Sequence, residues 1–255
     1  MAISPGQIAR WLDEALVVPQ AKGDSSANGL QVDASEPVTK LGFAVDACMD
    51  AFTEAKNQGC HMLLCHHGLY WKGDDQRATG LMGNRISYLI RNGVSLWACH
   101  LPLDMHPKYG NNAVLSIILG INNRKSFGMY HDLPLGFFGE VEGNPTCGEL
   151  AQRLSDGVLE CKPWIWSFGK KSCKNIGVVS GGGSYAIEEA AGLGLDCLVT
   201  GEVLHQDYHT AKELGINIIV AGHWATETVG ILSAGKAVAT FFGLESVFIN
   251  KPTGL

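Results

Sequence analysis

Charged residues are scarce in this chain of 255 residues: they make up only 17%, and the net charge is −6. With 19 Lys and Arg against 25 Asp and Glu, little basic surface remains for a phosphate backbone, which argues against nucleic acid as the main partner. No apolar run reaches the roughly 18 residues of a membrane span. The first residues, Met1 to Pro5, also lack the basic and apolar regions of a signal peptide. We therefore expect a cytoplasmic protein without a membrane partner.

The eight cysteines include no CxxC pair, and several lie within apolar, strand-like runs. This pattern favours buried thiols in a reducing compartment over disulfides. Gly181–Ser184 follows an expected strand and precedes an expected helix, but it matches neither a GxGxxG nor a Walker loop. Its backbone N–H groups could hold an anion. A tight turn that requires glycine torsions is the favoured interpretation.

Chemically active residues gather in three short segments, each placed where a buried strand is expected to end. These are residues 63–68 (LLCHHG), 98–104 (ACHLPLD) and 220–227 (VAGHWATE). Imidazoles and carboxylates thereby reach the strand ends, where open α/β sheets have their binding crevices. The composition is typical of a metal site. The spacing alone equally allows a structural role, in which the adjacent histidines cap a sheet and Asp104 begins a turn.

Mixed nitrogen and oxygen donors suit Zn, Mn, Fe, Co or Ni better than Ca or Mg. A catalytic zinc typically takes three protein groups, so five candidate ligands indicate two divalent ions per chain. The candidates are His66, His67, Asp104, His223 and Glu227. If Trp224 opens a helix, His223 and Glu227 share one face, and the carboxylate could bridge two ions.

The stretches 66–73, 100–107 with 110–112, and 222–227 resemble the signatures of the NIF-three-like dinuclear metal-centre family. Residues 28–32 and 200–202 also match, so the resemblance spans nearly the whole chain. Members are often labelled type-two GTP cyclohydrolase I homologues. By position, the resemblance implies the same five metal ligands and gives His100 a role in orienting a ligand by hydrogen bonding. It further implies a homohexameric ring with metal sites facing an internal cavity, here in the compact form that lacks the family's inserted domain.

The chain also contains an apparent duplication. A capping box at Ser4–Gln7 predicts a first helix to about Leu16, followed by a loop that includes residues 28–32. A shift of 135 residues then aligns 41–64 with 176–199 as strand, helix, strand. Residues 93–98 and 215–220 extend each copy by a third strand.

We therefore expect an α/β fold of two related βαβ-type halves, with mixed sheets flanked by helices and the metal site in the cleft between the halves. The first half, residues 1–125, carries the HHG and HLPLD motifs, and the second, residues 126–255, carries TGE and GHWATE. Residues 121–174 break the repeat and are expected to add edge strands, including 135–141 and 163–168, and a capped helix from Thr146.

Other polar residues have competing interpretations. Glu202 occupies the place in the second copy that His67 holds in the first, so Glu202 and His100 are candidate pocket residues. His205 and His209 have a spacing that can bind zinc, although exposed helix histidines are the favoured account. Residues 70–72 (YWK) could stack a flat substrate ring or pack the rim of a pocket.

The expected function is that of a metal-dependent hydrolase acting on a small molecule, because paired ions activate water. The cyclohydrolase label implies attack on a purine ring of GTP. No recognisable guanine reader or basic triphosphate cradle is present, so phosphoesters, cyclic amides and other nucleotide-like substrates all stay open. The alternative is a non-catalytic metal-binding scaffold or adaptor assembled as a ring. Five ligands on two ions leave positions open for water, which favours the enzyme.

Overall fold

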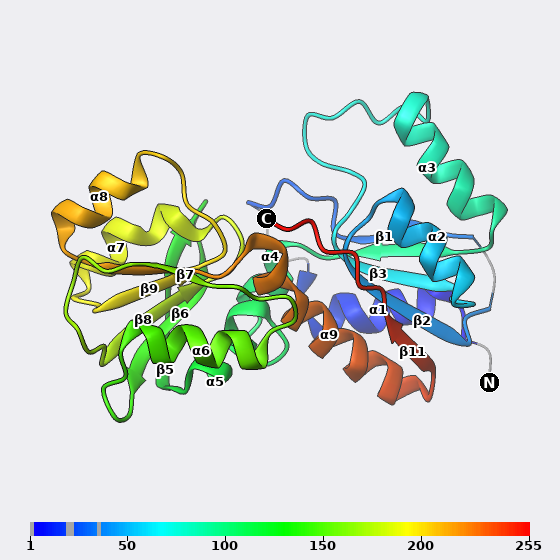
Figure 1. The fold of residues 1–255 in the computed structure, drawn as a ribbon. Helices are drawn as coiled ribbons and strands as arrows, with labels where there is room; N and C mark the ends of the chain where they lie inside the picture. Colours follow the sequence, from blue (N-terminus) through cyan, green and yellow to red (C-terminus); the bar gives the residue numbers. More distant parts are fainter. Residues whose placement is uncertain (1–2, 19–22, 35–36) are drawn as a thin grey trace. The chain divides into compact units, whose positions relative to one another are not determined.

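The computed structural model describes residues 3–18, 23–34 and 37–255 (Figure 1). The chain divides into two compact units, each with its own sheet. The first comprises residues 1–103 and 231–251, and the second comprises 104–230 and 252–255. The division thus differs from a single cut after residue 125, because the chain returns near its end to complete the first unit.

The first unit is built on a five-stranded sheet in the order β1-β4-β3-β2-β11. Strands β2, β3, β4 and β11 are parallel to their neighbours, whereas β1 pairs with β4 in the antiparallel sense. Helices α2 and α3 cover one face of this sheet, and α1 packs with the end of α9 on the other (Figure 1). Its elements are α1 (Pro5–Ala15), β1 (Gly29–Val32), β2 (Lys40–Asp46), α2 (Met49–Asn57), β3 (Met62–His67), α3 (Gly80–Arg91), β4 (Ser95–Ala98) and β11 (Glu245–Phe248).

The second unit is built on a six-stranded sheet in the order β5-β6-β8-β9-β10-β7. Helices α7 and α8 lie on one face and α5 and α6 on the other (Figure 1). Its elements are α5 (Asn111–Leu119), β5 (Ile121–Tyr130), β6 (Leu133–Val141), α6 (Cys147–Gly157), β7 (Trp164–Trp166), β8 (Asn175–Val179), η2 (Gly183–Ala186), α7 (Ile187–Gly192), β9 (Cys197–Thr200), α8 (Asp207–Leu214) and β10 (Asn217–Val220). The chain passes between units within two helices, α4 (Leu101–Met105) and α9 (His223–Phe242).

The two sheets confirm the expectation of related halves. In the first, β2, β3 and β4 are adjacent and parallel, and β8, β9 and β10 repeat this arrangement in the second. An antiparallel strand flanks the third strand of each set: β1 beside β4, and β7 beside β10. The carboxyl ends of the three parallel strands meet at one edge of each sheet, and this is where the candidate ligands lie.

Sequence patterns located most elements but missed some strands. The capping boxes at Ser4 and Thr146 are present and begin α1 and α6. Residues 28–32 were expected in a loop, but 29–32 form β1, because Leu30 and Val32 pair with β4. Strand β5 was not anticipated, because five consecutive residues from Asn122 to Ser126 are exposed and polar, so no alternation marks it.

The cores of both units are apolar, and none of the eight cysteines forms a disulfide. Seven of these cysteines are buried, as the sequence predicts. No helix in the described ranges combines the length and apolar content needed to cross a membrane.

Candidate metal centre

His66 and His67 are the last two residues of β3, at the edge of the first sheet where its parallel strands end. His66 is fully buried, and its Nδ1 lies 2.9 Å from the carbonyl oxygen of Cys99. A carbonyl only accepts hydrogen bonds, so Nδ1 must donate. The tautomer of His66 is thereby fixed, and Nε2 is the nitrogen that could bind a metal ion.

Carboxylates fix the imidazoles of His67 and His100 in the same way. His67 Nδ1 lies 2.8 Å from Asp46, the last residue of the neighbouring strand β2. His100 Nδ1 lies 2.8 Å from Asp24, whose side chain is 1% exposed. Burial alone would raise the pKa of Asp24, but the hydrogen bond and charge attraction from His100, together with hydrogen bonds from Asn28 and Ser26, lower that pKa. The carboxylate form of Asp24 is therefore favoured, and this form accepts the hydrogen bond that holds the ring.

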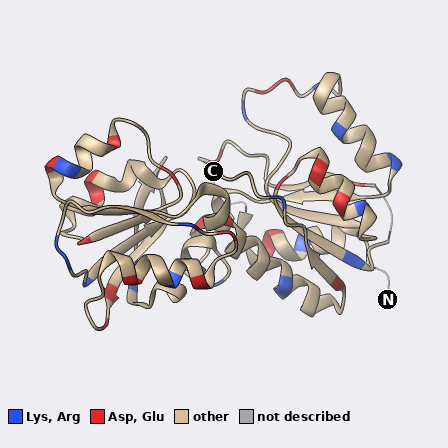
Figure 2. Ribbon diagram, viewed as in Figure 1, with Lys and Arg blue, Asp and Glu red and all other residues tan. Residues whose placement is uncertain are grey.

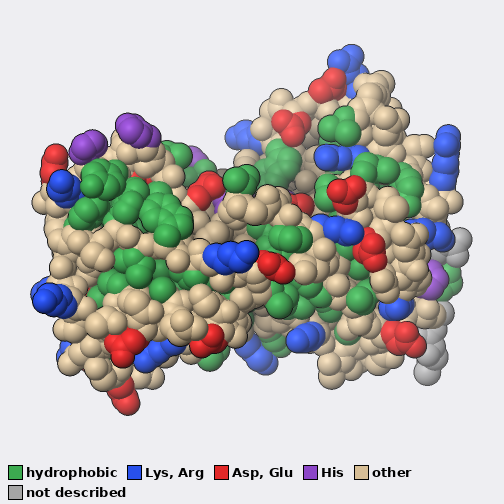
Figure 3. All heavy atoms as spheres, viewed as in Figure 1, with side chains coloured by type: hydrophobic (Ala, Val, Ile, Leu, Met, Phe, Trp, Pro, Cys, Tyr) green, Lys and Arg blue, Asp and Glu red, His purple; other side chains and the backbone are tan. Residues whose placement is uncertain are grey.

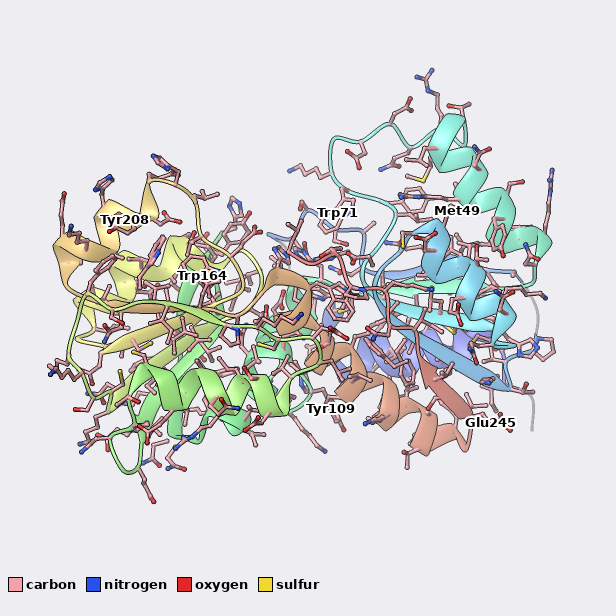
Figure 4. The ribbon with its side chains drawn as sticks, in the orientation of Figure 1. Met49, Trp71, Tyr109, Trp164, Tyr208 and Glu245 are labelled. Atoms are coloured by element: carbon pink, nitrogen blue, oxygen red, sulfur yellow. The ribbon has the colours of Figure 1, made fainter. Side chains whose placement is uncertain are left out.

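The three imidazoles form a compact group. Their ring centroids are 4.6 Å apart for His66 and His67, 5.2 Å for His66 and His100, and 5.6 Å for His67 and His100. One ring nitrogen from each lies within 4.8 Å of the others, a spacing that could hold a metal ion. Trp71, labelled in Figure 4, sits edge-on to His100 with a centroid distance of 5.0 Å. An aromatic wall therefore borders this group.

Asp104 is held in the second unit by buried polar side chains. Its Oδ1 accepts a hydrogen bond from Asn111 Nδ2 at 2.8 Å and another from the Ser180 hydroxyl at 3.0 Å. Asn111 in turn accepts from the Gly230 N–H, and the neighbouring Asn112 accepts from the Ser180 N–H. These asparagines fix the orientation of a carboxylate that is only 6% exposed.

His223 and Glu227 lie one turn apart at the start of α9, which confirms that a helix opens beside Trp224. His223 Nε2 is 3.2 Å from Glu227 Oε1, and its Nδ1 is 3.2 Å from Glu202 Oε1. Burial alone would lower the pKa of His223, but hydrogen bonds and charge attraction from Glu227, with Glu202 contributing, raise it to about 9. In the metal-free protein this imidazole is a cation between two carboxylates.

Gly181 allows the backbone to approach this pair. It has a φ of +58°, and a Cβ at this position would collide with the Glu227 carboxylate and meet His223 Nε2 at 3.1 Å. The N–H groups of Gly181 and Gly183 donate to the hydroxyls of Thr226 and Thr200. The chain thus bends at Gly181 and Gly182, beside the candidate ligands, and then enters the 3-10 helix η2 at Gly183; the N–H groups of Gly181 and Gly183 are both used within the fold.

The donor chemistry fits a transition metal. Imidazole nitrogens whose other ring nitrogen donates to a carboxylate or carbonyl are the usual form of metal-binding histidine in proteins. In the second unit, Asp104 and Glu227 bring carboxylate oxygens within 4.8 Å of each other. Groups in both units could therefore hold a metal ion, and their mixture of nitrogen and oxygen matches Zn, Mn, Fe, Co or Ni.

A pocket of about 550 Å³ adjoins this part of the second unit. Its wall includes Glu202, Trp224 and the indole of Trp164, which is 46% exposed and is labelled in Figure 4. The described lining contains one lysine, Lys162, against two glutamates, Glu160 and Glu202. The pocket therefore offers an aromatic surface and little positive charge.

His205 and His209 do not extend the centre. His205 precedes α8 and His209 lies within it, so they do not share the helical face that the spacing suggested. Both are exposed, and histidine side chains are visible at the surface near α8 (Figure 3).

Sequence reasoning missed the acceptors of the ring nitrogens, Asp24 and Asp46. A signal for Asp46 existed, because it ends β2 and pairs in register with His67. Asp24 lies in a loop, and its partner His100 is 76 residues away in the chain.

Comparison with known proteins assigns this chain and its fold to one family. The family model described as Duf34/NIF3 (NGG1p interacting factor 3) matches residues 4–253, so the chain belongs to this family. A relative from Pyrococcus horikoshii is 41% identical over 98% of both chains and is named GTP cyclohydrolase 1 type 2 homolog. A relative from Archaeoglobus fulgidus with the same name is 39% identical, also over 98% of both chains.

Solved structures show the same fold along the whole chain. The protein ybgI, described as of unknown function, has a TM-score of 0.91 and 33% identity, covering 99% of this chain and 100% of its own. A protein of Thermus thermophilus has a TM-score of 0.89 with the same identity and coverage. HcgD from Methanocaldococcus jannaschii, at 23% identity and a TM-score of 0.83, shares the fold.

Asn111 is expected to control both stability and metal affinity. Asn111→Ala removes the donor to Asp104 and leaves the Gly230 N–H without its acceptor, which should lower the free energy of unfolding by about 1 to 3 kcal/mol. Because Asp104 is then misoriented, metal affinity should fall roughly 10- to 100-fold. Denaturant unfolding and metal titration measure the two effects. The exposed Asn122→Ala serves as control, and an unchanged metal affinity in Asn111→Ala would contradict the assigned role.

The raised pKa of His223 predicts a pH-dependent stability of the metal-free protein. A folded-state pKa of about 9, above the ordinary value of 6.5, means that protonation stabilises the folded form. That stabilisation is complete below pH 6.5 and is lost as pH rises through about 9. The free energy of unfolding of wild type, relative to His223→Gln, should therefore decline across this window. The free energy of unfolding of the control, the exposed His209→Gln, should change with pH as it does in wild type. If the free energy of unfolding of His223→Gln also changes with pH as it does in wild type, the argument is refuted.

Proposed function

We propose that the chain is a dinuclear metal-dependent hydrolase of small molecules. In this proposal His66 and His67 act together with Asp104, His223 and Glu227 to hold two divalent ions. The observation that carries it is the shared anchoring of three proposed imidazole ligands: Nδ1 contacts Cys99 in His66, Asp46 in His67 and Glu202 in His223. Hydrogen-bond partners of this kind orient a histidine so that it can bind a metal ion. A histidine that merely caps a sheet does not need such a partner.

Several candidate groups lie in the chain next to the points where it crosses between the units, after Leu103 and after Gly230. Asp104 follows His100 by four residues: His100 immediately precedes the short helix α4, and Asp104 lies within it. His66 and His67 end β3, and His100 follows β4 in the first sheet. In the second sheet Glu202 follows β9, and the helix that begins at His223 follows β10. His100 and Glu202 are proposed as pocket residues that hydrogen bond to ligands or substrate.

Two bound divalent ions would supply a nucleophilic water at neutral pH and offset negative charge at the reacting centre. The residues of the chain would hold the ions and position the substrate. Glu227, held beside His223, would contribute carboxylate oxygens to both ions, and Asp104 would keep its orientation through Asn111 and Ser180. The pocket wall at Trp164 and Lys162 would position the substrate.

The pocket favours substrates with a flat ring and modest charge. An exposed indole can stack a planar ring, whereas one lysine beside two glutamates is a poor match for a triphosphate. Basic residues are also scattered among acidic ones along the chain (Figure 2), which fits a small-molecule substrate better than nucleic acid. A nucleotide-like base, a cyclic amide or a simple phosphoester is therefore proposed in preference to GTP itself, although relatives carry the cyclohydrolase name.

The second candidate function is a non-catalytic scaffold that binds metal and assembles as a ring. Exposed aromatic rings at Trp164 and Tyr208 provide a contact surface for such an assembly. The homohexamer implied by the resemblance, and the cytoplasmic location expected from the sequence, belong to both proposals.

The stoichiometry of metal tests the dinuclear centre. Metal-saturated protein purified without chelator should contain two transition ions per chain by elemental analysis, because five ligands exceed what one open site needs. Glu227→Gln keeps the size of the side chain and removes its charge, so it should lose at least one ion. Glu245→Gln, an exposed glutamate in β11, is the matched control. Saturation at one ion in wild type would refute the dinuclear model.

Metal-dependent turnover separates the enzyme from the scaffold. Hydrolysis of small phosphoesters and cyclic amides should vanish on chelation, return with Mn, Co or Zn, and rise with pH as bound water ionises near ~7 to 9. His67→Ala and Asp104→Asn should abolish it while the protein stays folded and assembled. If these variants hydrolyse as fast as wild type, the activity is contamination and the scaffold function stands.

A further inference from the structure

Three cysteines from distant parts of the sequence converge in the second unit, outside the residues discussed above. They are Cys147 at the first position of α6, Cys173 just before β8 and Cys197 at the first position of β9. The Sγ atoms all lie within 4.8 Å of one another, and those of Cys147 and Cys173 are 3.5 Å apart. All three residues are buried, with exposures of 7%, 0% and 0% in sequence order.

The backbone around the three thiols is fixed by hydrogen bonds. Thr146, which precedes Cys147, caps α6 through a capping box with Glu149 and forms an isolated bridge with Ser172. The Cys173 N–H donates to the carbonyl of Pro145 at 2.8 Å. Cys197 lies between β8 and β10 in the sheet. The sulfurs are thus positioned by three elements that do not need to rearrange.

Polar groups near the sulfurs favour a thiolate. Asn217 Oδ1 accepts from the Gly169 N–H at 2.8 Å, and Asn217 Nδ2 donates to the carbonyls of Lys170 and Asp196 at 2.8 and 3.0 Å. The same Nδ2 lies 3.8 Å from Cys173 Sγ, so a polar N–H group borders this sulfur. Cys147 sits at the N-terminus of an 11-residue helix, where the exposed N–H groups stabilise negative charge. Hydrogen bonds with Cys147 and Cys197 lower the pKa of Cys173, and the pKa values of Cys147 and Cys197 are raised. Of the three thiols, Cys173 is therefore the one that loses its proton most readily.

The distances between the three Sγ atoms suit a bound metal ion better than a disulfide. Three sulfurs bound to one ion at about 2.3 Å lie about 3.8 to 4.0 Å apart. The observed separations of 3.5 Å and up to 4.8 Å bracket that value, so small side-chain rotations suffice. A disulfide would use two of the thiols and leave the third without a role. Soft thiolates select Cu(I) and Zn(II) among the common ions.

We propose that Cys147, Cys173 and Cys197 form a separate binding site for a thiophilic metal ion, Cu(I) or Zn(II), in the second unit. The ion joins the start of α6, the segment before β8 and the start of β9. Because this site rests on residues other than the histidines and carboxylates, it is independent of the proposed hydrolase. Its occupancy should stabilise the second unit, since metal binding to a folded site adds to folding free energy.

The test uses the full-length protein, kept reduced and loaded anaerobically with Cu(I) in one arm and with Zn(II) in the other. Metal-edge X-ray absorption reports whether sulfur or nitrogen and oxygen surround the ion, so it separates this site from the histidine and carboxylate donors. We expect a sulfur shell in wild type in at least one arm, and the arm that gives it identifies the ion. A thermal unfolding transition that moves upward on loading should accompany that shell.

Cys197→Ser should remove most of the sulfur signal. It should also weaken metal affinity by more than roughly 10- to 100-fold, which is the typical effect of losing a group that only hydrogen bonds to a metal ligand. Cys161→Ser is the matched control: Cys161 is buried in the same unit, and its thiol donates to the Ala221 carbonyl outside the cluster. Circular dichroism confirms that each variant is folded. Wild-type protein without sulfur around either ion would overturn the proposal, whether or not the variants fold, and so would an equal sulfur signal in Cys197→Ser.

Discussion

The hydrogen bond at Nδ1 of each candidate histidine is the interaction on which the rest of the centre depends. A histidine can present either ring nitrogen, and only an acceptor on one side decides which one is used. His66 uses a backbone carbonyl, whereas His67 and His100 use Asp46 and Asp24. Each acceptor comes from an adjacent strand end or loop, so the geometry of the sheet directly sets the orientation of the rings.

The duplicated topology explains how one sheet pattern supplies two kinds of donor. Three parallel strands in the same order end at one edge in each unit. In the first unit the positions after these strands carry mainly imidazoles, and in the second unit they carry mainly carboxylates. Glu202 occupies the place of His67, and Gly181 occupies the place of Asp46. Because Gly181 lacks a side chain, the Glu227 carboxylate can occupy the space beside it.

Much of the fold was accessible from the sequence because local signals agreed. Capping boxes, the shift of 135 residues and apolar runs at strand positions located the parallel strands and their helices. Local sequence patterns did not predict strands whose formation depends on pairing with a distant strand. Gly29–Val32 becomes a strand only because β4 offers it an edge, and β5 carries five successive exposed residues that no periodicity marks as a strand.

The candidate centre shows the same division between local and long-range information. His66, His67, Asp104, His223 and Glu227 stand in short motifs and could be named directly from them. The residues that hold them are distant in the chain: Asn111 joins Asp104 to Gly230, and Asp24 reaches His100. No spacing rule connects such residues, because their proximity arises from the packing of whole elements. The three clustered cysteines were likewise indistinguishable from inert buried thiols in the sequence.

Charge balance links the metal-free protein to the proposed centre. Asp104 and Glu227 are 6% and 3% exposed, and two carboxylates this close and this buried repel each other. In the absence of metal the raised pKa of His223 provides a compensating cation. A divalent ion would take over that role, and His223 would bind it only after losing its proton. Two divalent ions would bring four positive charges against five carboxylates: Asp104, Glu227 and Glu202 in the second unit, and Asp46 and Asp24 beside the imidazoles of the first. A centre so close to neutral has little excess charge with which to bind a triphosphate, and it is better matched to a substrate of low charge.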